Sequence, residues 1–177
     1  ALFAIGDASG ASSHKFSSGS HTEGRIAGKA AVKYIIEKGA EPTVDMAKVE
    51  ELKKEVLTPL DLFEEHKGEF TDPEVNTHYI MPRQFLHRLQ KLMDEYAGGV
   101  TAAFKTSKAN LERGLELMDY LKEDSDKMAA RDLHELMRVW ENIQRMWIAE
   151  SHIRTMLFRE ETRWPGYYFR SDTPKMD

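Results

Sequence analysis

A carboxylate near the start of the chain is followed by a serine–glycine loop, and this pair has the chemistry to bind a polar ligand. Residues 2–5 form an apolar run that predicts a short strand, and Asp7 follows at its carboxyl end. Ligands of open α/β sheets bind at this end of the strands, where a carboxylate accepts hydrogen bonds from sugar or polyol hydroxyls. Ser18, Gly19 and Ser20 then open a predicted helix, whose free amides and positive dipole end favour a negatively polarised atom.

The helix after this loop is predicted to begin near Ser20. Ser20 and Glu23 have the spacing of a capping box, in which the two side chains satisfy two backbone amides of the first turn. Gly39 is suited to end the helix. One face carries almost no side chain, because it consists of Gly24, Ala27, Gly28 and Ala31. The helix can therefore lie close to a sheet or to a ligand, although a plain strand, turn and capped helix would have the same pattern.

The middle of the chain is predicted to be a connector. Residues 40–81 are charged and irregular, apart from one amphipathic helix predicted at residues 45–57. Pro59 blocks the easy continuation of that helix, because proline removes a helical hydrogen bond.

The second half of the chain is strongly helical in its hydrophobic pattern. Apolar residues recur with a period of about 3.6, which predicts helices at residues 82–97, 100–122 and 126–160. Short connections between long helices favour an antiparallel three-helix bundle over residues 82–160. In the third helix, the stripe expected to face the core comprises Leu133, Leu136, Met137, Trp140, Ile143 and Trp147.

The last segment, residues 161–177, is aromatic and lacks periodicity, so we expect it to be pinned to a surface. Three basic residues there either contact an anionic partner or form structural salt bridges: Arg163, Arg170 and Lys175. The chain opens on an apolar run without Met and without a strand to pair with, so we expect a piece of a longer protein. The predicted fold class is mainly α: a strand–loop–helix remnant of an α/β domain (residues 1–39), then the helical bundle.

The composition excludes several classes of protein. Hydrophobic residues make up 41% and charged residues 31% of the 177 residues, which is typical of a soluble protein and not of a disordered tail or a fibre. A net charge of −5 is too small to indicate a nucleic-acid partner, and no run approaches the ~18 apolar residues of a transmembrane segment. The absence of cysteine excludes iron–sulfur ligation by this chain and fits a cytoplasmic location. No metal site is predicted, because His134-Glu135 lacks the second histidine of HExxH.

Three strings near the start carry a family resemblance: L-F-A-I-G-D-A-S-G at residues 2–10, H-K-F-S-S-G-S at 14–20 and T-E-G-R at 22–25. They resemble the second FAD-binding segment of the succinate dehydrogenase/fumarate reductase flavoprotein superfamily. Within it, H-K-F-S-S-G-S and the closing T-R-W-P-G at 162–166 are most similar to the alpha subunits of dissimilatory adenylylsulfate reductases. The resemblance covers nearly the whole chain but only the C-terminal part of such a subunit, so the superfamily's N-terminal GxGxxG segment is absent.

The resemblance implies roles for residues of the first segment. Asp7 stands where the family has an acidic residue that binds the ribityl chain of FAD. Ser20 and His21 are expected at the pyrimidine edge of the flavin, and Ser18 and Gly19 are expected to bind the cofactor beside them. The residues expected near the flavin or the substrate are His14, Lys15 and Phe16. Amides aimed at the flavin stabilise the negative charge of its reduced form; no catalytic residue is assigned.

The resemblance also implies an activity and partners. The family reduces adenosine 5′-phosphosulfate reversibly to sulfite and AMP, through a sulfite adduct at flavin N5. Its electrons come from an iron–sulfur beta subunit that holds [4Fe–4S] clusters in an alpha–beta heterodimer. We expect this chain alone to be inactive, because the segment that binds the FAD pyrophosphate lies outside it.

Fumarate and succinate enzymes differ from this chain at the histidine-containing loop. They carry H-G-A-N-R-L-G-G-N-S there, with an arginine that holds the dicarboxylate, whereas this chain has a shorter run with Lys15 in that place. Lysine lacks the rigid fork that binds a carboxylate through two hydrogen bonds. Two alternatives stay open: a related flavoprotein of the fumarate reductase or aspartate oxidase type, and a non-enzymatic helical interaction module.

Overall fold

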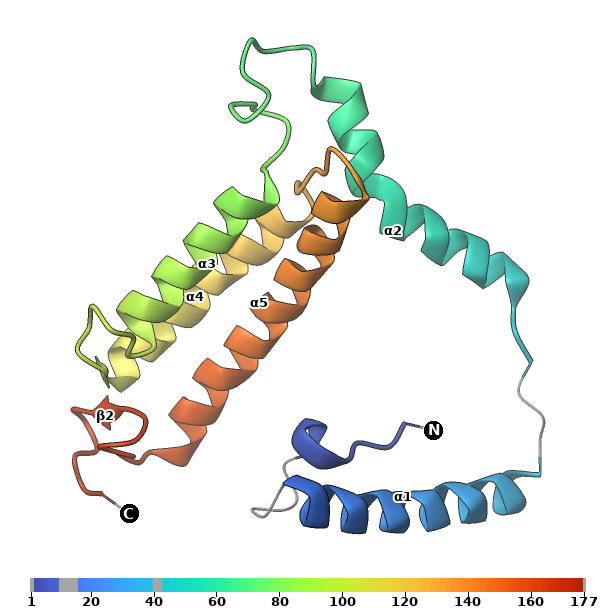
Figure 1. Cartoon of the computed structure of the whole chain (residues 1–177). Coiled ribbons are helices and arrows are strands. Elements are labelled where there is room, and N and C mark those ends of the chain that lie inside the picture. The colour runs from blue at the N-terminus through green and yellow to red at the C-terminus, as the bar shows by residue number, and fades with distance from the viewer. Residues whose placement is uncertain (1, 10–15, 40–42, 177) are drawn as a thin grey trace. The chain divides into compact units, whose positions relative to one another are not determined.

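A computed structural model of the chain describes residues 2–9, 16–39 and 43–176 (Figure 1). The chain divides into two compact units, Ala1–Ala47 and Lys48–Asp177, which we describe separately. Helices dominate both, so the predicted mainly α fold class is confirmed. No helix among the described residues has the length and apolar content needed to cross a membrane.

The first unit contains a short 3-10 helix, η1 (Gly6–Ala8), and a long helix, α1 (Phe16–Lys38). Residues 2–5 are not the predicted strand. Ile5 has an extended backbone (φ −139°, ψ 163°), but a strand needs a neighbour for its backbone groups, and no described segment pairs with these residues.

The start of α1 differs from the prediction, whereas its end agrees. The helix begins at Phe16, so Ser20 lies in the second turn and the predicted capping box of Ser20 with Glu23 is wrong. At the other end, Gly39 adopts a positive φ of 59°, and its amide donates to the carbonyl of Ile35 at 3.1 Å. This left-handed glycine ends the helix as expected.

Helix α2 (Met46–His66) runs through Pro59, so the predicted stop at that proline is wrong. Pro59 removes one helical hydrogen bond, but its buried ring and its carbonyl take part in tertiary packing. The Pro59 carbonyl accepts from the amide of Ala130 at 2.9 Å, and the carbonyl of Val56 accepts from Trp140 Nε1 at 3.1 Å. These contacts hold the helix together across the proline.

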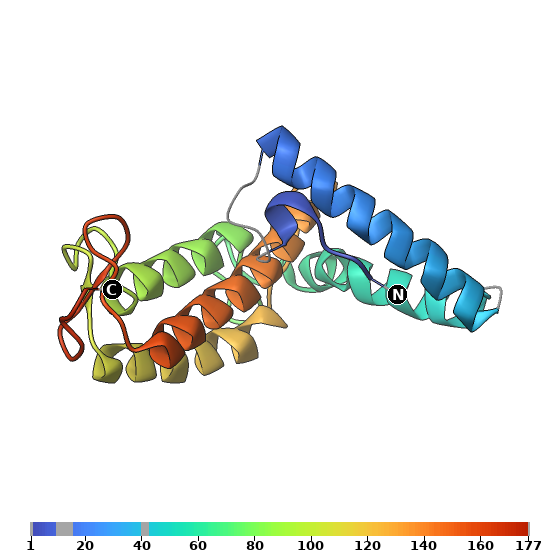
Figure 2. The same ribbon diagram turned by 90° about the horizontal axis from the view of Figure 1, so that it is seen from below.

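Three further helices form the main body of the second unit: α3 (Pro82–Tyr96), α4 (Lys108–Ser125) and α5 (Leu133–Arg159). They lie side by side in Figure 1 and Figure 2 and pack pairwise around one core. The side chains at its centre are fully buried: Phe85, Leu111, Met118, Val139 and Ile153.

Capping side chains set the starts of α4 and α5, both of which begin about seven residues later than predicted. Ser107 Oγ accepts from the amide of Asn110 at 3.2 Å, and Asp132 Oδ1 accepts from the amide of Glu135 at 2.8 Å. Each satisfies an amide that the first turn leaves without a helical partner. The periodicity shows that the helices exist, whereas these caps decide where they begin.

The buried face of α5 is rotated relative to the predicted stripe. Its buried residues are Leu136, Val139, Asn142, Met146, Ala149, Ile153 and Met156. Leu133, Met137 and Trp147 are exposed, and Trp147 keeps 60% of its surface accessible. The prediction that Trp147 belongs to the core is therefore wrong, while Trp140 is half-buried and packs against the core.

The C-terminal segment is held to the rest of the second unit by a parallel pairing of its strand β2 (Phe169–Arg170) with β1 (Lys105–Thr106). The Arg170 side chain is buried, and its Nη1 donates to the carbonyl of Met156 at 2.6 Å. Its Nε donates to Asp172 Oδ1 at 3.0 Å. A cation at this carbonyl of the last turn also suits the negative end of the α5 dipole, so Arg170 has the structural role that the sequence left as one of two alternatives.

Candidate cofactor-binding segment

The turn that carries Asp7 is held against α1 through Gly6. The Gly6 amide donates to Glu23 Oε2 at 2.6 Å, a charge-assisted hydrogen bond that joins the turn to the helix. Gly6 has a positive φ of 59°, and a Cβ there would lie only 3.2 Å from Ser20 Oγ. Glycine is required because it tolerates this backbone conformation and lets the turn approach the helix closely.

The face of α1 next to this turn is formed by small residues, as its sequence predicts. The half-buried positions recur at helical spacing: Gly19, Ser20, Glu23, Gly24, Ala27 and Ala31. A Cβ at Gly24 would come within 3.9 Å of Ile5 Cδ1, so the extended segment also touches this face. Gly28 is exposed, and a Cβ there would meet nothing within 4 Å, so it lies outside the contact.

The structure places the predicted cofactor-binding residues in three settings. Asp7 lies exposed in η1, directly after the glycine that is bonded to Glu23. Gly19 and Ser20 are half-buried on the contact face of α1, whereas Ser18 and His21 are exposed. Phe16 is 88% exposed at the first residue of α1, while His14 and Lys15 lie outside the described residues.

The start of α1 at Phe16 changes which amides face a ligand. In an α-helix that begins there, the Ser20 amide is directed at the Phe16 carbonyl. Phe16 has a positive φ of 54°, so the amides that have no acceptor within the helix are those of the first turn from Ser17 onward. The prediction that Ser20 supplies an amide at the helix end is therefore wrong, because the helix extends one turn further than the capping pattern indicated.

Glu23 is the positioning residue that sequence reasoning missed. Its spacing from Ser20 suggested a capping partner, but its carboxylate instead accepts from Gly6, seventeen residues earlier in the chain. The interaction joins residues on either side of the loop, so local spacing does not reveal it. The related signal in the sequence is Gly6 itself, since a glycine next to an acidic residue is typical of a tight turn, and the structure gives it a positive φ.

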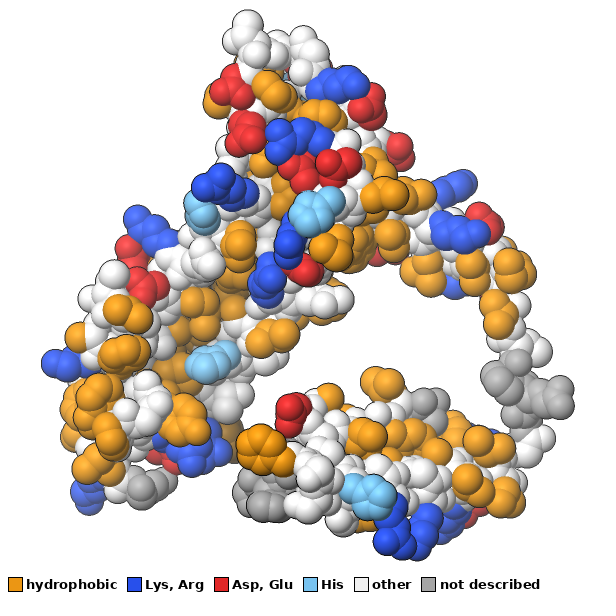
Figure 3. All heavy atoms as spheres, in the orientation of Figure 1, with side chains coloured by type: hydrophobic (Ala, Val, Ile, Leu, Met, Phe, Trp, Pro, Cys, Tyr) orange, Lys and Arg blue, Asp and Glu red, His pale blue; other side chains and the backbone are white. Residues whose placement is uncertain are grey.

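The first unit has almost no interior of its own. Gly6 is the only buried residue among those that the structure describes in this unit. Large apolar side chains are instead exposed: Leu2, Phe3, Ile5, Ile26, Val32, Ile35 and Ile36. Figure 3 shows hydrophobic side chains gathered over α1 and the segment before it. Exposed apolar surface of this extent is typical of a surface that another part of a protein covers.

Comparison with known proteins places this segment in a family. No family model matches the chain. A curated relative, adenylylsulfate reductase subunit alpha of Megalodesulfovibrio gigas, is 49% identical over 177 residues, which cover 99% of this chain and 26% of the relative. The chain thus spans about a quarter of the length of the relative it matches.

Solved structures agree with this similarity. Adenylylsulfate reductase of the hyperthermophilic Archaeoglobus fulgidus superimposes with a TM-score of 0.90 at 58% identity, over 99% of this chain and 27% of that one. A structure of adenosine-5-phosphosulfate reductase in complex with sulfite as a covalent adduct matches with the same values. The Sdh1 complex of Mycobacterium smegmatis has a TM-score of 0.69 at 24% identity over 99% of this chain and 28% of that one, a likeness of fold alone. Over 99% of its length, the chain is thus similar to part of the adenylylsulfate reductase alpha subunit.

Proposed function

We propose that this chain is part of an FAD-dependent adenylylsulfate reductase subunit, an oxidoreductase of sulfur metabolism. The whole subunit would convert adenosine 5′-phosphosulfate and two electrons to sulfite and AMP, in a reversible reaction. The observation that carries the proposal is the 58% identity, over 99% of this chain, to a reductase solved as a covalent sulfite adduct. Because the chain spans only 27% of that protein, the activity would belong to the complete subunit.

The first unit has donors and acceptors that fit FAD. When bound, FAD supplies reversible two-electron transfer. The exposed carboxylate of Asp7 would accept hydrogen bonds from the ribityl hydroxyls, and the hydrogen bond from Gly6 to Glu23 would hold that carboxylate in place. The first turn of α1, from Ser17 onward, would direct amides and a positive dipole end at the flavin, and these stabilise negative charge.

Three further groups of residues would contribute less directly to cofactor binding than Asp7. Gly19 and Ser20 would let the cofactor or the preceding turn approach the helix closely, since both are small and half-buried on the contact face. Exposed His21 and Ser18 would border the flavin from the helix surface. His14 and Lys15, which lie outside the described residues, are proposed near the flavin or substrate only through their place in the sequence.

The domain organisation follows from this assignment. Residues 1–39 would be a segment of the FAD-binding domain, and residues 82–160 with the tail at 161–177 would form the helical domain. Residues 40–81 would connect them and contribute α2, most of which belongs with the helical unit.

We propose an iron–sulfur beta subunit as the partner that delivers electrons. This chain has no cysteine to ligate a cluster, and its resemblance to the family supports [4Fe–4S] centres in the partner of an alpha–beta heterodimer. A cysteine-free chain also fits a reducing, cytoplasmic setting.

The experiment that tests the site is Asp7→Ala in the intact subunit. Loss of a charged acceptor facing buried hydroxyls weakens binding by roughly 1.5–3 kcal/mol, about ten- to a hundredfold in FAD affinity. Glu37→Gln, at an exposed acid near the other end of α1, is the matched control and should leave FAD affinity unchanged. Full FAD occupancy and an unchanged flavin potential in Asp7→Ala would overturn the assignment of Asp7. Turnover of fumarate in place of adenosine phosphosulfate would overturn the proposed activity.

A further inference from the structure

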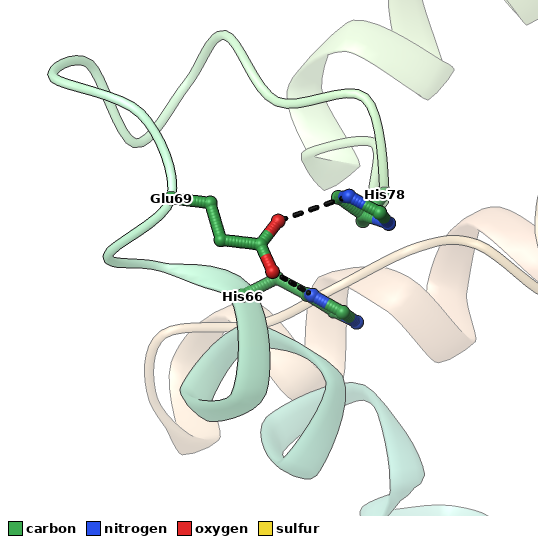
Figure 4. A group of neighbouring side chains, drawn as sticks. All are labelled: His66, Glu69 and His78. Atoms are coloured by element: carbon green, nitrogen blue, oxygen red, sulfur yellow. Dashed lines mark hydrogen bonds and ion pairs between the residues drawn. The ribbon is translucent and has the colours of Figure 1, made fainter.

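A second group of polar side chains lies in the other unit, where the sequence predicts no metal site. His66 ends α2, and Glu69 and His78 come from the loop between α2 and α3 (Figure 4). One ligand atom from each of the three lies within 4.8 Å of the other two. Glu69 sits between the histidines: its Oε1 is 2.9 Å from His66 Nδ1, and its Oε2 is 2.9 Å from His78 Nε2.

Both histidines are anchored by buried neighbours. Phe63, one helical turn before His66, packs on Tyr79, which directly follows His78, with ring centroids 5.6 Å apart. Both aromatic residues belong to a small buried cluster with Met81 and Ala129. Tyr79 Oη also donates to the carbonyl of Pro73 at 2.6 Å. The backbone is therefore fixed on both sides of the group.

Asn76 joins the two histidines through the main chain. Its Nδ2 donates to the carbonyl of His66 at 3.0 Å, and its Oδ1 accepts from the amide of His78 at 2.8 Å. The amide of Glu69 donates to the same His66 carbonyl at 3.2 Å. One side chain thus sets the spacing of the two loop ends, which is the kind of outer support that orients ligands in metal sites.

We propose that His66, Glu69 and His78 bind a divalent transition-metal ion, of which Zn²⁺ is the best fit. Imidazole and carboxylate are the ligands that suit Zn²⁺ when thiolate is absent, and three protein ligands leave a fourth position for water or another group. The site is independent of the cofactor segment, because all three residues belong to the second unit.

The side chains must rearrange to accept the ion. Ligand atoms at 2.0–2.1 Å from a tetrahedral Zn²⁺ are separated by about 3.3 Å, so the two 2.9 Å nitrogen–oxygen contacts must open by a few tenths of an ångström. The imidazole rings are stacked, with centroids 4.3 Å apart and planes inclined by 7°, so one ring must rotate out of the stack before an ion can lie near both planes. The His78 side chain is 50% exposed, against 18% for His66, so His78 has the room to move.

Titration of the full 177-residue chain with Zn²⁺ by calorimetry tests the proposal. We expect one saturable site, at least tenfold weaker in each of His66→Ala, Glu69→Gln and His78→Ala. His87→Ala, at an exposed histidine of α3, is the matched control and should bind as the unchanged chain does. Circular dichroism shows whether each variant is folded; Glu69→Gln and His78→Ala alter exposed side chains and decide the matter if His66→Ala fails to fold.

Thermal unfolding supplies a second measurement that does not depend on redox activity. An ion that binds only the folded chain raises the midpoint of unfolding, so Zn²⁺ should raise it in the unchanged chain and in His87→Ala but not in His78→Ala. The proposal is overturned if the unchanged chain shows no saturable Zn²⁺ binding. It is overturned equally if Glu69→Gln and His78→Ala bind as tightly as His87→Ala does, since the group would then be a hydrogen-bonded contact between loop and helix.

Discussion

The two units of the chain differ in how far their apolar side chains are buried. In the second unit, α3, α4 and α5 bury theirs in one shared core. In the first unit, a helix of 23 residues buries no side chain and exposes several large apolar ones. Since burial of apolar surface is the main stabilising term in folding, the second unit holds its own structure, whereas the proposed cofactor segment depends on surfaces that cover it.

Hydrogen exchange on the isolated chain gives the largest expected contrast between the units. Core amides of α4 and α5 should exchange only through global opening, with protection of roughly 5 kcal/mol or more. Amides of α1 should show little protection, because the helix has no buried face in this unit. The contrast breaks down if α1 is protected as strongly as α5.

Two side-chain truncations, one in each unit, test the same contrast through the free energy of unfolding. Phe85→Ala removes a fully buried ring of α3 and should lower the free energy of unfolding by about 3–5 kcal/mol. Ile35→Ala, at an exposed position of α1, should change it by less than about 0.5 kcal/mol. Chemical denaturation measures both, and a loss at Ile35 comparable to that at Phe85 would show that α1 is packed in solution.

Features set by local residues and features set by distant contacts differ in how far the sequence predicts them. Helix ends marked by a local residue were found: Pro82 begins α3 and Gly39 follows the end of α1. Features set by distant contacts were missed, because no local pattern encodes them. Pro59 lies inside α2, where its carbonyl accepts a hydrogen bond from the amide of Ala130. Trp147 is exposed because tertiary packing buries another face of α5.

The same difference between local signals and distant contacts applies to the two candidate sites. Asp7 was identified through a family resemblance, and its exposed place in a turn beside α1 agrees with a ligand-facing residue, although its role in FAD binding stays a prediction. The bond from Gly6 to Glu23 was missed because it spans a loop. His66 and His78 were also missed, since only the packing of α2 against the loop before α3 brings them together.

Substitution at Gly6 tests whether the first unit keeps its turn geometry in the intact subunit. Gly6→Ala places a side chain at a positive φ of 59° and close to Ser20, which costs about 1–2 kcal/mol. If the turn positions Asp7, FAD affinity should fall by roughly five- to thirtyfold. Gly28→Ala is the control, because a Cβ there meets nothing within 4 Å and alanine favours the helix. Equal FAD affinity in the two variants would separate the turn from the cofactor.

The smallest expected effect is the pH dependence of a helix–helix ion pair in the second unit. Lys122 Nζ of α4 lies 2.9 Å from Glu150 Oε2 of α5, and the hydrogen bond from Lys122, with a further one from Arg154, holds the pKa of Glu150 below its ordinary value of 4.5. A carboxyl group whose pKa is lowered by folding stabilises the fold above its unfolded pKa, and it loses that contribution as the pH falls through the folded pKa.

Glu150→Gln should therefore lower stability at neutral pH by about 0.5–1 kcal/mol, within the usual range for a partly exposed pair. It should lower stability by less at a pH below the folded pKa of Glu150, where the unchanged chain has itself lost the charge. Glu112→Gln removes an exposed acid of α4 whose nearest cation, Lys108, is 3.9 Å away, and it should have a smaller effect at both pH values. Denaturation midpoints at the two pH values measure the difference. If Glu150→Gln is equally destabilising at both, the side chain contributes by packing and not by charge, and the second unit relies on its apolar core even more than the burial pattern indicates.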